Sequence, residues 1–229
     1  MFKKNTNRDE VKDFEGGSND YLTKSGMYED VIIKSLIYDE AENGGAVVNL
    51  FVEHNGVAQV VYGDIRVYNK DGKDNAIGQK QLNELMVILD VDLGEPVEVE
   101  LPIGKGGAMK TVAVFEEVVD EAITIKIMNK YGVWNGNITE KCTVAKFYRA
   151  SDKATAAEIL LAEDEPDEVS FGTKYEKDVE FAENVKYDND LTAEEVSAWI
   201  KAKRPKGTAG TSAKAKPTSF KKPVKKFGA

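Results

Sequence analysis

The chain has 229 residues and carries 31 lysines and arginines against 40 aspartates and glutamates, a formal net charge of −9. This length suits one mid-sized domain with appendages, or two small domains. A single cysteine, Cys142, and a single histidine, His54, exclude an internal disulfide framework, a Cys/His zinc site and most nucleophile–histidine catalysis. No apolar run is long enough to span a membrane, and the first residues contain no apolar signal segment. We therefore expect a cytoplasmic, non-enzymatic protein without metal or cofactor.

The predicted elements begin with an N-terminal arm of mixed composition, residues 1–24. Three β-rich runs follow, and the dipeptide Asn55-Gly56 between the second and third is typical of a tight hairpin turn. The predicted strands are Tyr28–Tyr38, Val47–His54 and Val57–Tyr68. Next, the segment Gln79–Asp90 has apolar side chains at positions i, i+3, i+4 and i+7, which predicts one amphipathic helix.

Further strands are predicted after this helix, with a loop from residue 130 to 140. They are Val97–Ile103, Lys110–Val119, Ala122–Asn129 and Lys141–Arg149. A short helix is expected over Ala154–Glu163, followed by weakly ordered sequence to residue 189. Thr192 and Glu195 have the spacing of a capping box, which predicts a last helix ending near Lys203.

Three strands, one helix and further strands are the order of an OB-fold, a small Greek-key barrel with its helix between the third and fourth strands. The alternative is a β-sandwich with a packed helix. The predicted division is an N-terminal arm (1–24), an OB-fold-like nucleic-acid-binding core (25–150), an acidic, partly helical extension (151–203) and a disordered basic tail (204–229).

The charges are distributed unevenly along the chain. Residues 151–200 hold fifteen acidic and four basic residues, whereas residues 201–229 hold ten basic residues and no acidic one. The tail contains almost nothing to bury, so it cannot offset the entropy of ordering. Lysine pairs beside phenylalanines favour contacts with phosphates and bases, although a purely solubilising tail is the alternative. The expected tail contacts are Lys221, Lys222, Lys225, Lys226 and Phe227.

Basic and aromatic side chains on the predicted strands are the candidate binding residues of the core. In the third strand, alternation places Ile65 and Val67 on one face and Tyr62, Arg66 and Tyr68 on the other. Between residues 122 and 149, five basic residues oppose one acidic residue, and four aromatic residues lie among them. Aromatic rings stack on unpaired bases while cations contact phosphates. The expected contacts are Arg66, Tyr68, Lys70, Lys73, Lys105, Lys110, Lys126, Lys130, Tyr131, Trp134, Lys146 and Tyr148.

The glycine-rich segment from Gly104 to Thr111 has part of the pattern of a phosphate-binding loop. That pattern requires glycine before the lysine, where this chain has Met109, and a helix after it, where this chain has a predicted strand. Nucleotide hydrolysis is therefore not indicated, and Lys105 and Lys110 are expected as exposed cations of a hairpin. Paired carboxylates lie without histidine or lysine at useful spacing, so no metal site is predicted.

Three runs carry a resemblance to a known family: Ser25–Ile33, Val60–Ile65, and Asp71–Lys73 continued by Gly78–Met86. Together they resemble the single-stranded DNA-binding proteins of tailed bacteriophages, over roughly residues 25–150. The resemblance implies an OB-fold and a protein that coats single-stranded DNA during phage replication, recombination or transcription, in the host cytoplasm. Many such proteins end in an acidic tail, whereas here the acidic stretch Glu163–Glu168 is internal and the end is basic.

The partners implied are single-stranded DNA and replication, recombination or RNA polymerase proteins that contact the C-terminal region. The alternative function is that of a structural or adaptor protein, a virion component or a polymerase-interacting factor, whose basic tail contacts DNA or a partner.

Overall fold

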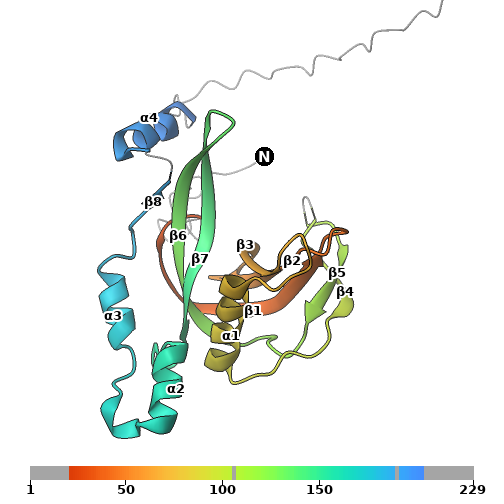
Figure 1. Cartoon of the computed structure of the whole chain (residues 1–229), viewed down its shortest axis with the longest axis vertical. Coiled ribbons are helices and arrows are strands. Elements are labelled where there is room, and N and C mark those ends of the chain that lie inside the picture. Colours follow the sequence, from red (N-terminus) through yellow and green to blue (C-terminus); the bar gives the residue numbers. More distant parts are fainter. Residues whose placement is uncertain (1–20, 105–106, 189–190, 204–229) are drawn as a thin grey trace, which may run out of the picture. The chain divides into compact units, whose positions relative to one another are not determined.

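The computed structural model describes residues 21–104, 107–188 and 191–203, and Figure 1 shows the chain coloured from its N-terminus to its C-terminus. Most of the predicted N-terminal arm, the whole basic tail and Lys105 lie outside the described residues. The chain divides into two compact units between Leu191 and Thr192, and each is described by itself. The first unit is mainly β, as the sequence predicts, and its eight described strands belong to one sheet.

The first three strands form an antiparallel meander. They are β1 (Gly26–Glu40), β2 (Ala46–His54) and β3 (Val57–Tyr68). Alternate residues of β2 are fully buried, because one face of this sheet covers the main hydrophobic core. Asn55 and Gly56 have φ angles of 50° and 77°, the left-handed conformation that a two-residue hairpin turn requires. The predicted meander is confirmed.

The helix α1 (Ala76–Leu89) lies between β3 and β4, where the sequence predicts a helix, and begins three residues earlier than expected. The side chain of its cap, Asn75, accepts a hydrogen bond from the backbone N–H of Gly78 at 3.0 Å. A Cβ on Gly78 would lie 1.8 Å from the carbonyl oxygen of Arg66. Glycine therefore permits the close approach of α1 to β3, and Leu85 and Ile88 are buried in the core.

The sheet branches at β1. The hairpin of β4 (Val97–Leu101) and β5 (Lys110–Phe115) pairs with the second half of β1, while β6 (Ala122–Trp134) pairs with its first half. The β4–β5 hairpin occupies the edge of β1 along its second half. Strand β6 therefore pairs with β1 only over residues 26–32. Among the described residues no ladder joins β3 to β7, so the sheet is open rather than the closed barrel that we expected.

Strands β6 and β7 (Asn137–Arg149) form a long two-stranded ribbon, here called the arm, which extends past the other strands in Figure 1. The loop predicted over residues 130–140 is wrong, because the ladder continues to the pair Trp134–Asn137. Asn135 and Gly136 have φ angles of 49° and 75°, so they form the same kind of tight turn as Asn55 and Gly56.

The segment after the arm forms α2 (Ala156–Asp164), a short 3-10 helix (Pro166–Glu168), α3 (Thr173–Val179) and β8 (Lys186–Tyr187). The predicted helix over 154–163 is confirmed as α2, which begins at a capping box of Thr155 and Glu158. The prediction of weak order up to residue 189 misses α3 and β8. Strand β8 pairs in parallel with β6 at Lys130 and Tyr131.

The second unit contains α4 (Ala193–Lys203). Its predicted capping box is confirmed: the Thr192 hydroxyl accepts a hydrogen bond from the backbone N–H of Glu195 at 3.2 Å, and the Glu195 carboxylate accepts one from the backbone N–H of Thr192 at 2.9 Å. Within the parts of the chain that the structure describes, no helix has the length and apolar character needed to cross a membrane.

Candidate nucleic-acid interface

The two strands of the arm place four lysines on one face. Lys126 lies opposite Lys146 across the ladder, and Lys130 lies opposite Lys141. Residues 126 and 130 share a face of β6 because strand residues alternate in direction, and the odd-numbered isoleucines 123, 125 and 127 point into the core. We call this surface the basic face of the arm. Its base half consists of Lys126, Lys146 and Tyr148, and its tip half consists of Lys130, Lys141 and Trp134.

The base half surrounds one carboxylate of α3, that of Asp178. The Lys126 ammonium group donates to Oδ1 of Asp178 at 3.0 Å and to its backbone carbonyl at 3.2 Å. The Tyr148 hydroxyl donates to Oδ2 at 2.8 Å, and the Lys146 ammonium group donates to the same oxygen. Two lysines that face each other directly repel, so Asp178 supplies the counter-charge that this half requires.

The protonation of this cluster follows from its contacts. Burial alone raises the pKa of Asp178, but hydrogen bonds from Lys146, Tyr148 and Lys126 outweigh it and lower that pKa to about 2. Burial and the hydrogen bond to Asp178 raise the pKa of the Tyr148 hydroxyl. At neutral pH the carboxylate is therefore ionised and the phenol is protonated.

Several predicted contacts in the arm are not exposed. Tyr148 is fully buried and its ring makes an edge contact with Tyr175, at 5.3 Å between centroids. Tyr131 is buried as well, because its hydroxyl donates to Glu140 at 2.7 Å and its ring stacks on Tyr187. Contrary to the prediction, neither ring presents a stacking surface. Lys126 is also buried, with 8% of its surface exposed.

The tip half is more open. The Trp134 side chain is 71% exposed, Lys141 is exposed and Lys130 is half-buried. Strand β8 adds Lys186 directly beside Lys130, so three lysines lie side by side across β8, β6 and β7. We call Lys186, Lys130 and Lys141 the lysine row. Lys186 lies 3.4 Å from a carboxylate oxygen of Asp188.

Two members of the lysine row, Lys141 and Lys186, were not among the contacts predicted from the sequence. Lys141 could have been placed by treating Asn135-Gly136 as a turn, which fixes the register of the arm. Lys186 had no comparable signal, because β8 has two residues and no alternation to detect.

The remaining predicted contacts lie outside the arm. Arg66 is exposed on β3, Lys70 and Lys73 are exposed in the turn after it, and Lys110 is exposed at the start of β5. The Lys73 ammonium group lies 3.1 Å from the Asp71 carboxylate. Tyr68 is half-buried and packs against the core. The structure therefore divides the predicted contacts between two parts of the sheet rather than joining them in one trough.

Cys142 and the metal-binding types of side chain are the other chemical groups of interest among the described residues. Burial, followed by the nearby Glu140 charge, raises the pKa of the half-buried Cys142 thiol to about 11, so the thiolate is scarce at neutral pH. No group of three or more His, Cys, Asp or Glu side chains within the described ranges is placed to hold a metal ion. No protein-family model, curated protein or solved structure matches the chain.

Proposed function

We propose that this protein binds single-stranded DNA without sequence preference, and that the tip half of the basic face together with Lys186 makes the first contact. The observation that carries the proposal is the lysine row beside the exposed Trp134 ring. Lysines attract the phosphates of a flexible strand, and an exposed aromatic ring stacks on any base. A net charge of −9 does not oppose this, because binding depends on the local field of the basic face rather than on the total charge.

The base half suggests how the contact is extended along the arm. The Asp178 carboxylate receives hydrogen bonds from two ammonium groups and one hydroxyl, a set of donors that also suits phosphate oxygens. None of the residues of α3 is buried, and its contacts with the rest of the unit include the hydrogen bond from Tyr175 to Glu29. A helix held mainly by polar contacts is released at low cost, so we infer that a bound strand displaces α3 and takes over these donors.

We further propose that the core is an open relative of the OB-fold. The order β1, β2, β3, α1, β6, β7, with β1 between β2 and β6, matches that fold when the β4–β5 hairpin is counted as an insertion. The proposed binding arm then corresponds to the last hairpin of the fold. The cellular role that fits is protection of exposed strands during phage replication, recombination or transcription, as the resemblance of residues 25–150 implies.

A fluorescence titration tests the proposal. In the full chain with Trp199→Phe, Trp134 is the remaining tryptophan, so its emission reports on the tip of the arm. Addition of oligo-dT should quench this emission, and added salt should reverse the quenching because counterion release drives phosphate contacts. The matched control adds Lys73→Gln and Lys110→Gln, two exposed cations outside the arm, and should titrate like the parent. Binding that leaves Trp134 emission unchanged contradicts the proposed interface.

A further inference from the structure

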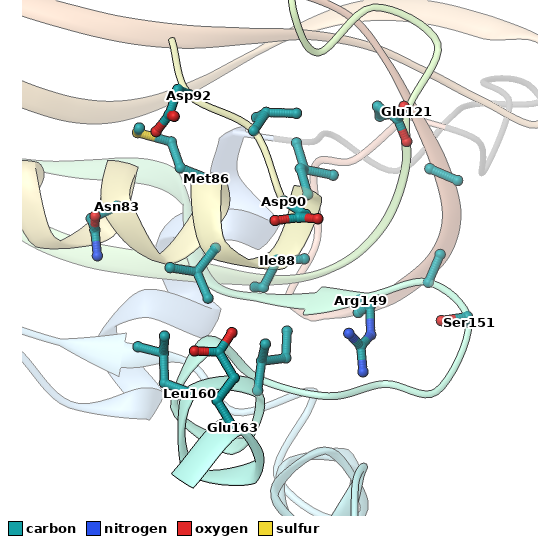
Figure 2. Close-up of a pocket in the computed structure, with 16 residues that line it drawn as sticks. Asn83, Met86, Ile88, Asp90, Asp92, Glu121, Arg149, Ser151, Leu160 and Glu163 are labelled. Atoms are coloured by element: carbon teal, nitrogen blue, oxygen red, sulfur yellow. The ribbon is translucent and has the colours of Figure 1, made fainter.

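A groove of about 680 Å³ lies where the C-terminal part of α1 faces α2 and the turn after β7, and none of its lining residues belongs to the lysine row. Its lining is mixed: the apolar side chains of Met86, Ile159 and Leu160 lie among a larger share of polar groups. Leu160 is 46% exposed, so part of its side chain is open to a ligand. Figure 2 shows Ile88 and Leu160 between the two helices. The groove therefore offers apolar surface to a ligand.

The rim of the groove is negatively charged. Four exposed acidic residues line it: Asp90, Asp92, Glu121 and Glu163, and Figure 2 shows their carboxylates around the opening. The cation among the lining residues is Arg149, and its guanidinium group is already engaged. It donates to both carboxylate oxygens of Asp152 and lies 5.0 Å from the ring centre of Phe171. A ligand of this groove must therefore combine positive charges with apolar side chains.

One segment of the chain has this chemistry. Residues 220–227 read Phe-Lys-Lys-Pro-Val-Lys-Lys-Phe, so four positive charges alternate with Phe220, Val224 and Phe227. The four lysines equal the four carboxylates of the rim in number and are opposite in sign, and the apolar residues suit the apolar side chains of the lining. A segment of this length is short enough to be recognised as a peptide in a groove.

We propose that the groove binds residues 220–227 of a second copy of the chain. The groove and the segment are different surfaces, so the contact is heterologous and joins successive copies in an open row instead of closing a dimer. The sixteen residues between Lys203 and Phe220 can span up to about 55 Å, enough to reach a neighbouring copy. The choice of a second copy rests on the proposed function, because copies bound side by side on a strand raise one another's effective concentration to the millimolar range.

Sedimentation of the full chain without DNA, at low salt and up to about 1 mM protein, tests this proposal. The groove variant carries Asp92→Asn, Glu121→Gln and Glu163→Gln, and the tail variant carries Lys222→Gln, Lys225→Gln and Lys226→Gln. The control variant carries Glu40→Gln, Glu42→Gln and Glu98→Gln, three exposed carboxylates outside the groove. The wild type and the control should associate into species larger than dimers, and each of the other two variants should associate at least about tenfold more weakly.

A mixture of the two variants is the decisive sample. The tail variant contributes an intact groove, and the groove variant contributes an intact segment 220–227. The mixture should form a one-to-one pair and nothing larger. A wild type that stays monomeric while the mixture pairs would show that each groove holds its own chain's tail, and would overturn the second-copy proposal. A mixture that does not pair overturns recognition of the segment itself.

A separate measurement distinguishes this inference from the proposed function. Binding to an oligo-dT short enough for one copy should be the same for the wild type and the groove variant, because the groove lies outside the lysine row. If the wild type does not bind the short oligo-dT, the proposed function is wrong, whereas the sedimentation result is unaffected. If the wild type binds the short oligo-dT but does not self-associate, only the inference about the groove is wrong.

Discussion

The two halves of the arm's basic face contain the same arrangement, a lysine opposite a lysine, in different surroundings. In the base half, Lys126 and Lys146 share the Asp178 carboxylate, which the protein supplies from α3. In the tip half, Lys130 and Lys141 lie beside a third lysine, Lys186, whose neighbour Asp188 is 3.4 Å away. The comparison teaches that the same lysine pairing surrounds a carboxylate at the base and is more exposed at the tip, and the proposed function assigns the first contact with phosphates to the exposed half.

The largest effect is expected from neutralising the lysine row. The triple variant Lys130→Gln, Lys141→Gln and Lys186→Gln should bind oligo-dT about 10- to 100-fold more weakly at low salt. The slope of log K against log salt should become shallower by about 2, since roughly three phosphate contacts are lost. Neutralising Lys70, Lys73 and Lys110 instead should change neither value appreciably. Equal losses in the two triple variants would mean that only total charge matters.

A smaller loss is expected from Trp134→Ala. Stacking of one base contributes about 1 kcal/mol at the lower limit of its range, so the affinity should fall about fivefold, with the salt dependence unchanged. Because the ring is 71% exposed, the free energy of unfolding in urea should change by less than about 0.5 kcal/mol. A salt slope that changes together with the affinity would indicate that the variant disturbs the lysines as well.

A gain rather than a loss is expected from Asp178→Asn. The substitution removes the ion pairs with Lys126 and Lys146, so α3 should dissociate more often and the base half should become available. Affinity for oligo-dT should rise about three- to tenfold, and amide hydrogens of α3 should exchange faster. Asp167→Asn, at an exposed position on the 3-10 helix, makes the same change in net charge. The control should change neither the affinity for oligo-dT nor the hydrogen exchange of α3. If the control gains as much affinity as Asp178→Asn, the effect is due to net charge.

The smallest effect is expected from changing the pH near neutrality, because Asp178 binds a proton only at low pH. Its pKa is lowered to about 2 in the folded chain, so its stabilising contribution is fully present above the unfolded pKa of about 4 and is lost as the pH falls toward 2. The docking of α3 should be constant from pH 8 to pH 5, and its hydrogen-exchange protection should decline below about pH 4. The contribution is on the order of 2 kcal/mol. The Asp178→Asn variant should lack this acid transition. If the transition is still present in that variant, it belongs to another carboxyl group.

Local sequence signals were sufficient for much of the first unit. The alternation of β1, the dipeptide Asn55-Gly56 and the spacing of apolar residues in α1 each act over a few neighbouring positions, and the strand, the turn and the helix all appear in the structure. The second dipeptide, Asn135-Gly136, carries the same signal as the first. The segment from residue 130 to 140, which contains two glycines, was predicted as a loop, so the predicted strands of the arm are too short.

The base half could not be predicted in the same way. Asp178 is 52 residues from Lys126 in the sequence, and α3 has no apolar face whose period would reveal it. The burial of Tyr148 depends on that distant carboxylate and on Tyr175, so strand alternation alone could not decide whether the ring faces solvent. Charge and aromatic content located the arm, whereas tertiary contacts decided which of its residues are exposed.

A lysine acetylation footprint, read by mass spectrometry with and without oligo-dT, tests the central claim most directly. DNA should protect Lys130, Lys141 and Lys186, while Lys73 and Lys110 should be modified at the same rate in both samples. Protection confined to Lys221, Lys222, Lys225 and Lys226, with the three lysines of the row equally modified in both samples, would contradict it.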